Sequence, residues 1–400
     1  MNRRRASSIV VGLIVSTTLL LAACGPAEPD LARDPHPVGS QLPEVDTTGM
    51  WLSTPYTDLR IVDPGWETTV RYADGVYLSA GERDGALEFT ALDIHGDVLW
   101  AAQRPISCTG FTLSTDSTGR TLAVLTDTRT TDDALAGTTA TAYDLTTGDH
   151  VWGPVQVPGV YQGPGLVYAA PPEGPMGDTG PRTALDPSTG HVAAEESDRA
   201  DERIIGEYDG TLLLADGHAL IGRDAAVDQD LWRIPLAEHG WTTAGLGPSL
   251  EASPGSGLAL IETSGSAGAL IDLSRGTVID DDALDAAVDP TSGTRVVLDG
   301  DGLHASDAGG KSLWSTAVTP GTSIAALGGV MLYLREEDKG AVRVHNAITG
   351  DVAQAYAPDG HGTIVVPEHI TGQGAALLLD GQRRLLATVT HKALKDGRSL

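Results

Sequence analysis

Residues 142–152 read Ala-Tyr-Asp-Leu-Thr-Thr-Gly-Asp-His-Val-Trp, an apolar stretch that ends at Asp144, a turn that ends at Gly148 and a second strand that reaches Trp152. An aspartate side chain can accept hydrogen bonds from the backbone of its own turn, and glycine adopts the positive φ that tight turns require. The stretch therefore predicts a β-hairpin.

The same pattern recurs along the chain. Further copies lie at residues 91–100, 184–190, 224–232, 271–276, 307–314 and 346–350, and a degenerate one lies at 379–382. Trp100, Trp232 and Trp314 occupy the place of Trp152, whereas three other copies have Ala194, Asp280 and Gln354 there. In the copy at 224–232, Asp228 stands where the glycine is expected.

A second repeated element is a glycine followed by a short apolar strand. Its copies begin at Gly75, Gly119, Gly165, Gly210, Gly257, Gly293, Gly329 and Gly374, at intervals of 44, 46, 45, 47, 36, 36 and 45 residues. Strand, hairpin and strand at a period of about 43 residues fit one four-stranded blade per repeat. The sequence predicts an all-β chain that forms a single β-propeller of eight four-stranded blades, with seven as the alternative because two intervals are short.

The last repeat lacks a strand. After residues 383–390, which can form its third strand, only a polar tail remains. An open sheet edge invites pairing with other chains. We therefore expect the N-terminal segment 57–62 to add the missing outer strand and close the ring.

The copies that contain tryptophan resemble the PQQ-like repeat, which is the tryptophan-docking blade of quinoprotein dehydrogenases and of the outer-membrane assembly lipoproteins. The resemblance covers roughly residues 50 to 390. It implies that Trp100, Trp152, Trp232 and Trp314 have a structural role and pack between neighbouring blades.

The N-terminus indicates export. Arg3, Arg4 and Arg5 precede an apolar run that is too short to span a membrane comfortably, and small residues lead to Cys24. The stretch 21–24 resembles the lipobox of bacterial lipoproteins, which implies cleavage before Cys24 and attachment of lipid to its sulfur. An ordinary secretory signal is the alternative. We predict a signal peptide at 1–23, a proline-rich disordered tether at 24–47 and the propeller at 48–400, held outside the cytoplasm, with the outer face of the cytoplasmic membrane favoured.

Charge and cysteine content limit the partners and the cross-links that the chain can have. With 26 basic and 54 acidic residues the formal net charge is −28, which argues against nucleic-acid binding. Cys24 and Cys108 are the only cysteines, so lipidation of Cys24 leaves no intramolecular disulfide. We expect Cys108 to be a buried apolar residue.

The chain carries none of the common hydrolase motifs. It has no nucleophile elbow, no Ser-x-x-Lys and no His-Glu-x-x-His. It also lacks the vicinal cysteine pair that the quinoprotein resemblance implies for an enzyme, so no cofactor and no metal are expected. Asp299-Gly300-Asp301-Gly302 lacks the rest of a calcium loop and predicts a tight turn.

One group of side chains remains a candidate ligand site. His361, Glu368 and His369 could meet on the axial face, where propellers generally bind ligands. The sequence favours a non-catalytic, lipid-anchored binding or scaffold protein whose partner is an unidentified envelope protein or ligand. The alternatives are a quinone-dependent oxidoreductase or small-ligand sensor, and an outer-membrane assembly scaffold.

Overall fold

The computed structural model describes residues 31–107, 110–131, 134–172, 179–197, 201–247, 255–263, 267–336 and 341–390. The chain divides into two units, residues 1–31 and 32–400, and the second contains all of the strands described below. Cys24 and Cys108 lie outside the described residues. Among the residues that are described, no helix has the length and apolar character needed to cross a bilayer.

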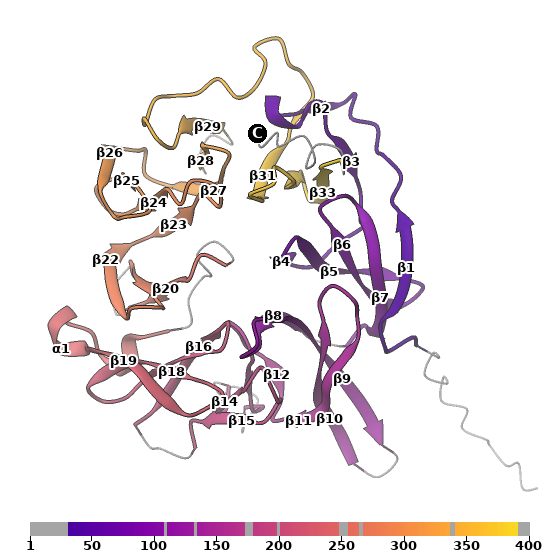
Figure 1. The fold of residues 1–400 in the computed structure, drawn as a ribbon, viewed down its shortest axis with the longest axis vertical. Helices are drawn as coiled ribbons and strands as arrows, with labels where there is room; N and C mark the ends of the chain where they lie inside the picture. The colour runs from indigo at the N-terminus through magenta and orange to yellow at the C-terminus, as the bar shows by residue number, and fades with distance from the viewer. Residues whose placement is uncertain are drawn as a thin grey trace, which may run out of the picture. The chain divides into compact units, whose positions relative to one another are not determined.

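Unit 32–400 is an eight-bladed propeller, as the repeats predict, and its blades follow one another around a common centre (Figure 1). Blades 1 to 4 comprise β4 (Arg71–Ala73), β5 (Val76–Arg83), β6 (Ala86–Asp93) and β7 (Asp97–Pro105); β8 (Phe111–Thr115), β9 (Thr121–Thr131), β10 (Ala134–Asp144) and β11 (His150–Val157); β12 (Val160–Tyr161), β13 (Val167–Ala169), β14 (Arg182–Leu185) and β15 (Val192–Glu195); and β16 (Arg203–Tyr208), β17 (Thr211–Ala215), β18 (Ala219–Asp224) and β19 (Gln229–Pro235).

Blades 5 to 8 comprise β20 (Leu258–Glu262), β21 (Gly268–Asp272) and β22 (Thr277–Ala283); β23 (Asp285–Val288), β24 (Arg295–Leu298), β25 (Leu303–Ser306) and β26 (Ser312–Thr316); β27 (Thr322–Gly328), β28 (Met331–Glu336) and β29 (Ala341–Asn346); and β31 (Val366–Ile370), β32 (Ala376–Asp380), β33 (Arg383–Thr388) and β3 (Arg60–Val62). Single bridges supply the fourth position in blades 5 and 7, from Gly247 to Glu262 and from His345 to Val352.

The two short repeat intervals do not remove a blade. Each short interval still contains four strands, β20 to β23 between Gly257 and Gly293 and β24 to β27 between Gly293 and Gly329. The alternative of seven blades is therefore wrong. In the described part of the chain, helix is limited to α1 (Leu236–His239) and the 3-10 turns at Thr54–Tyr56 and Thr243–Gly245, which lie in connections between strands.

The ring closes as expected. Strand β3 pairs antiparallel with β33, which joins Ile61 to Ala387 and Val62 to Leu386. Ile61 and Val62 are fully buried. A second N-terminal segment, β2 (Met50–Trp51), pairs in parallel with β30 (Thr363–Ile364) in the connection from blade 7 to blade 8.

The second half of the predicted tether differs from the expectation of disorder. Strand β1 (His36–Gln41) pairs with β7 as a fifth strand of blade 1, although every residue of β1 is exposed. Arg104, which is buried, donates to the backbone oxygen of Arg33, and the Arg33 guanidinium pairs with Asp127. Backbone pairing and these polar contacts order the segment without an apolar pattern that the sequence would reveal.

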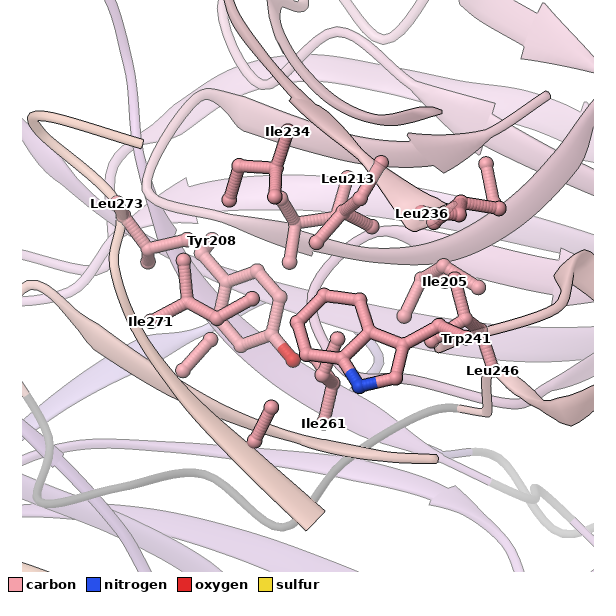
Figure 2. Packing of buried hydrophobic residues seen from close by; sticks show 14 residues of the cluster. Ile205, Tyr208, Leu213, Ile234, Leu236, Trp241, Leu246, Ile261, Ile271 and Leu273 are labelled. Atoms are coloured by element: carbon pink, nitrogen blue, oxygen red, sulfur yellow. The ribbon is translucent and has the colours of Figure 1, made fainter. Parts of the chain in front are cut away.

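The core is divided among the gaps between blades. Among the described residues, buried apolar side chains form eight clusters, and each joins two neighbouring blades. Figure 2 shows the cluster between blades 4 and 5, where Tyr208 and Trp241 lie beside Ile261 and Ile271. Each blade is therefore stabilised chiefly by its neighbours, since one sheet alone cannot bury both of its faces.

The repeated hairpins have the predicted turn chemistry. In each of the seven full copies the Asp or Asn side chain accepts a backbone N–H of its own turn, as Asp144 does from Thr146 and Thr147; the other acceptors are Asp93, Asp186, Asp224, Asp272, Asp307 and Asn346. Asp228 adopts a φ of 51° and so takes the conformation of the missing glycine.

The four repeat tryptophans reach from one blade to the next. The indole N–H of Trp152 donates a hydrogen bond of 2.6 Å to the backbone oxygen of Pro187. Pro187 is the residue that follows the turn aspartate of blade 3. Trp100, Trp232 and Trp314 make the equivalent bonds to Leu145, Leu273 and Ala347. Each ring also covers the turn glycine of the following blade, and a methyl group at Gly190 would lie 2.5 Å from the Trp152 ring.

Candidate functional site

A cavity of about 460 Å³, which we call the axial cavity, lies along the first strands of blades 6, 7 and 8. Strands β23, β27 and β31 supply most of its lining, together with Gly255 and Ser256 in front of β20. The first strands lie toward the centre of the ring, as Figure 1 shows for β23 and β31. The volume of the axial cavity falls within the range of small-ligand pockets, roughly 300 to 1,000 Å³.

Two aspartates at opposite ends of β23 line the cavity. Asp289 is fully buried, and its carboxylate accepts from Thr291, Ser292 and Val330, so it belongs to the turn that follows β23. Asp285 accepts from the backbone N–H of Ala286 and, across the blade boundary, from that of Ile324 at 2.8 Å. Burial raises the pKa of Asp285 above its ordinary value, which favours the neutral acid in the absence of a cation.

His369 forms the wall that faces blade 1. Its Nδ1 lies 3.0 Å from the Tyr77 hydroxyl, and its ring packs on Tyr72 at 4.4 Å between centroids. Burial lowers the pKa of His369 to about 4, so the imidazole is neutral near pH 7. A neutral imidazole offers one donor and one acceptor, and hydrogen bonding at Nδ1 fixes its orientation.

Glu368 lies beside His369 in a bulge of β31. Its neighbours Pro367 and His369 pair with Leu378 and Leu377, and the extra residue leaves the Glu368 carboxylate 3.1 Å from the Arg384 guanidinium. The structure thus brings two of the three candidate side chains, Glu368 and His369, to one cavity. His361 is exposed in the connection before β30 and does not line the cavity.

The other candidates lie elsewhere. Asp299 accepts from Asp301 and Gly302 in the turn between β24 and β25, as predicted. None of the four repeat tryptophans lines the axial cavity. Within the described ranges no three His, Cys, Asp or Glu side chains are grouped to hold a metal ion.

Sequence reasoning missed Asp285, which lines the cavity, and Tyr72 and Tyr77, which contact His369. Asp285 opens β23 without a motif around it, and the two tyrosines stand in short strands next to apolar residues, with nothing that marks them as contacts of His369. Tyr77 and His369 are 292 positions apart, and only closure of the ring brings them together.

Comparison with known proteins adds little. No family model matches the chain, and no curated protein matches it. Two solved structures of AztD from Citrobacter koseri, one of them an apo form, are similar to it at 14% identity, covering 73% of this chain and 86% of that chain, with TM-scores of 0.41 and 0.40. Similarity at that level carries no argument about function, and the PQQ-like resemblance stays a prediction.

Proposed function

We propose that this chain is a non-catalytic binding protein of the cell envelope, held at the outer face of the cytoplasmic membrane by lipid on Cys24, and that it takes a small organic cation in the axial cavity. The observation that carries the proposal is the cavity itself, about 460 Å³ lined by Asp285, Glu368 and neutral His369.

The polar lining favours a cation. Each carboxylate oxygen of Asp285 accepts one hydrogen bond from the backbone, and a carboxylate has about four acceptor positions. An ammonium group close to Asp285 would favour its ionised form and so oppose the effect of burial on its pKa. The net charge of −28 raises the local concentration of cations around the protein.

The contacts of the lining also support binding over catalysis. Asp289 holds the turn that follows β23, and Glu368 pairs with Arg384. Both carboxylates thus have structural partners. A general base needs an accessible group whose pKa suits proton transfer near the working pH, and His369 at about 4 lies well below that range.

Calorimetric titration with putrescine tests the binding, and 1,4-butanediol of the same length is the neutral control. We expect the wild type to bind putrescine and not the diol, and Asp285→Asn to bind putrescine at least about tenfold more weakly, which corresponds to about 1.4 kcal/mol. Asp307→Asn is the matched control, because it removes one charge from the same blade while asparagine can cap the turn, as Asn346 does. Equal binding of the diol, or no effect of Asp285→Asn, would refute the cation proposal.

Membrane attachment is tested separately. Expressed from the full sequence in a bacterium that processes lipoproteins, the wild type should partition into the detergent phase and Cys24→Ser into the aqueous phase, because two or three acyl chains anchor far more firmly than none. If wild type and Cys24→Ser both partition into the aqueous phase, the lipid anchor is refuted, and this result has no bearing on the cation site.

A further inference from the structure

Residues 32–41, which we call the docked segment, run along the outer edge of blade 1 from one end of β7 to the other. Near the last residues of β7, the backbone N–H of Gln103 donates to the backbone oxygen of Ala32 at 2.7 Å. Near its first residues, Gln41 pairs with Asp97. The chain therefore joins the propeller at Ala32, well before residue 48, where the sequence predicted that the propeller begins.

Polar contacts hold the docked segment to blades 1 and 2. Arg33 pairs with Asp127 of β9, and the Tyr143 hydroxyl of β10 donates to the Asp34 carboxylate at 3.0 Å. Every residue of β1 is exposed, so β1 buries little apolar surface and contributes little to the core. These contacts fix the position of the segment, and a role other than stabilising the core explains them better.

The docked segment leaves a short reach to the proposed lipid anchor. Ala32 is eight positions after Cys24, and eight residues span at most about 28 Å when they are fully extended. The tether predicted at 24–47 would span about 70 Å, at about 3 Å per residue. Docking of residues 32–41 therefore keeps blade 1 close to any membrane that holds Cys24.

The docked end of blade 1 is the end with the hairpin between β5 and β6. Strand β7 pairs antiparallel with β6, which places Pro105 opposite Ala86, at the base of this hairpin. Blade 6 has the equivalent hairpin between β24 and β25, and Asp285 pairs with Leu298 at its base. Asp285 therefore lies at the end of blade 6 that corresponds to the docked end of blade 1.

We propose that the docked segment orients the protein on the membrane, so that blade 1 stands nearest the bilayer with its β5–β6 hairpin end toward the lipid. Blade 5, across the ring in Figure 1, then points away, and the Asp285 end of the axial cavity faces the membrane. The net charge of −28 opposes adsorption to anionic lipid, but salt limits this repulsion to about 8 Å, less than the reach of the tether. The proposal rests on the lipid anchor of the proposed function and adds an orientation to it.

Energy transfer to the bilayer tests this orientation. The full-length lipidated protein, with Cys108→Ser, carries one fluorophore at Glu82→Cys or at Arg275→Cys, and vesicles of phosphatidylcholine contain an acceptor lipid. Glu82 is exposed beside the β5–β6 hairpin, whereas Arg275 is 76% exposed in the turn between β21 and β22 of blade 5. We expect transfer to be at least twofold more efficient from position 82 than from position 275.

Two insertions of the same twelve Gly and Ser residues form a matched pair. Insertion after Asp30 lengthens the reach between the lipid and the docked segment, so the difference between the two positions should shrink at least twofold. Insertion after Thr48 lies in an exposed turn beyond the docked segment and should leave both efficiencies unchanged.

The outcomes separate this inference from the anchor itself. A wild-type protein that does not associate with the vesicles would refute the lipid anchor and the orientation together. Association with equal transfer from positions 82 and 275 would refute the orientation alone. So would an effect of the Thr48 insertion as large as that of the Asp30 insertion, because the segment would then not be docked.

Discussion

Single residues connect the blades. The turn glycine is needed for its backbone conformation and also because the tryptophan of the preceding blade lies on it, as Trp152 lies on Gly190. The spacing in the sequence predicted the turn and its capping aspartate. It could not show the hydrogen bond from the indole to the next blade, because that bond joins residues 35 positions apart.

Trp152→Phe should therefore lower the free energy of unfolding by about 1 to 3 kcal/mol, since it removes one hydrogen bond and leaves the buried oxygen of Pro187 without its donor. Urea unfolding followed by circular dichroism measures the change. Trp51→Phe is the control, because the Trp51 indole N–H has no hydrogen-bond partner in the described structure. A loss as large for Trp51→Phe as for Trp152→Phe would contradict the role of the indole bond.

His369 should make stability depend on pH. The pKa of His369 in the folded protein, about 4, lies below the ordinary 6.5. The contribution of the neutral imidazole to the free energy of unfolding is therefore complete above pH 6.5 and is lost as the pH falls toward 4. A shift of that size corresponds to at most about 3 kcal/mol. Only the wild type loses stability through protonation of this side chain. The difference in free energy of unfolding between wild type and His369→Gln should therefore shrink by up to this amount from pH 7.5 to pH 4.

Urea unfolding at pH 4, 5.5 and 7.5 measures this difference. His191→Gln, at an exposed position in a turn, makes the same replacement outside the core and is measured alongside as the control. A constant difference for His369→Gln would show that burial does not hold the imidazole neutral.

Among the elements, two of the three N-terminal strands, β1 and β3, have different roles. Strand β3 supplies the outer strand of blade 8 and buries Ile61 and Val62, whereas β1 adds an exposed fifth strand to blade 1. The sequence predicted β3 because the last repeat lacked a strand. It could not predict β1, whose residues show no apolar alternation and whose partners Arg104 and Asp127 lie far along the chain.

Ile61→Ala should cost about 2 to 5 kcal/mol, because it leaves a cavity where the ring closes. Val38→Ala in β1 should change the free energy of unfolding by no more than about 0.5 kcal/mol, since Val38 is 40% exposed. Denaturant unfolding of both variants makes the comparison. Similar losses would mean that closure through β3 is not a principal source of stability.

At the scale of the whole molecule, the repeats determine far more of the fold than of the binding sites. Eight glycines in register predict eight blades because each repeat buries its apolar faces against its neighbours. The axial cavity lies outside the repeat pattern: Asp285, Glu368 and His369 occupy positions where other blades have different residues. Side chains that break the repeat carry the proposed function, and one sequence cannot show which of them converge.

The most direct test of the central claim is the titration of the wild-type protein with putrescine at pH 5.5 and at pH 8. Because burial raises the pKa of Asp285, the ionised fraction of this side chain is larger at pH 8 than at pH 5.5, and we expect putrescine to bind at pH 8 at least as tightly as at pH 5.5. Binding that is tighter at pH 5.5 than at pH 8 would contradict the role of Asp285, and no binding at either pH would contradict the axial cavity as a cation site.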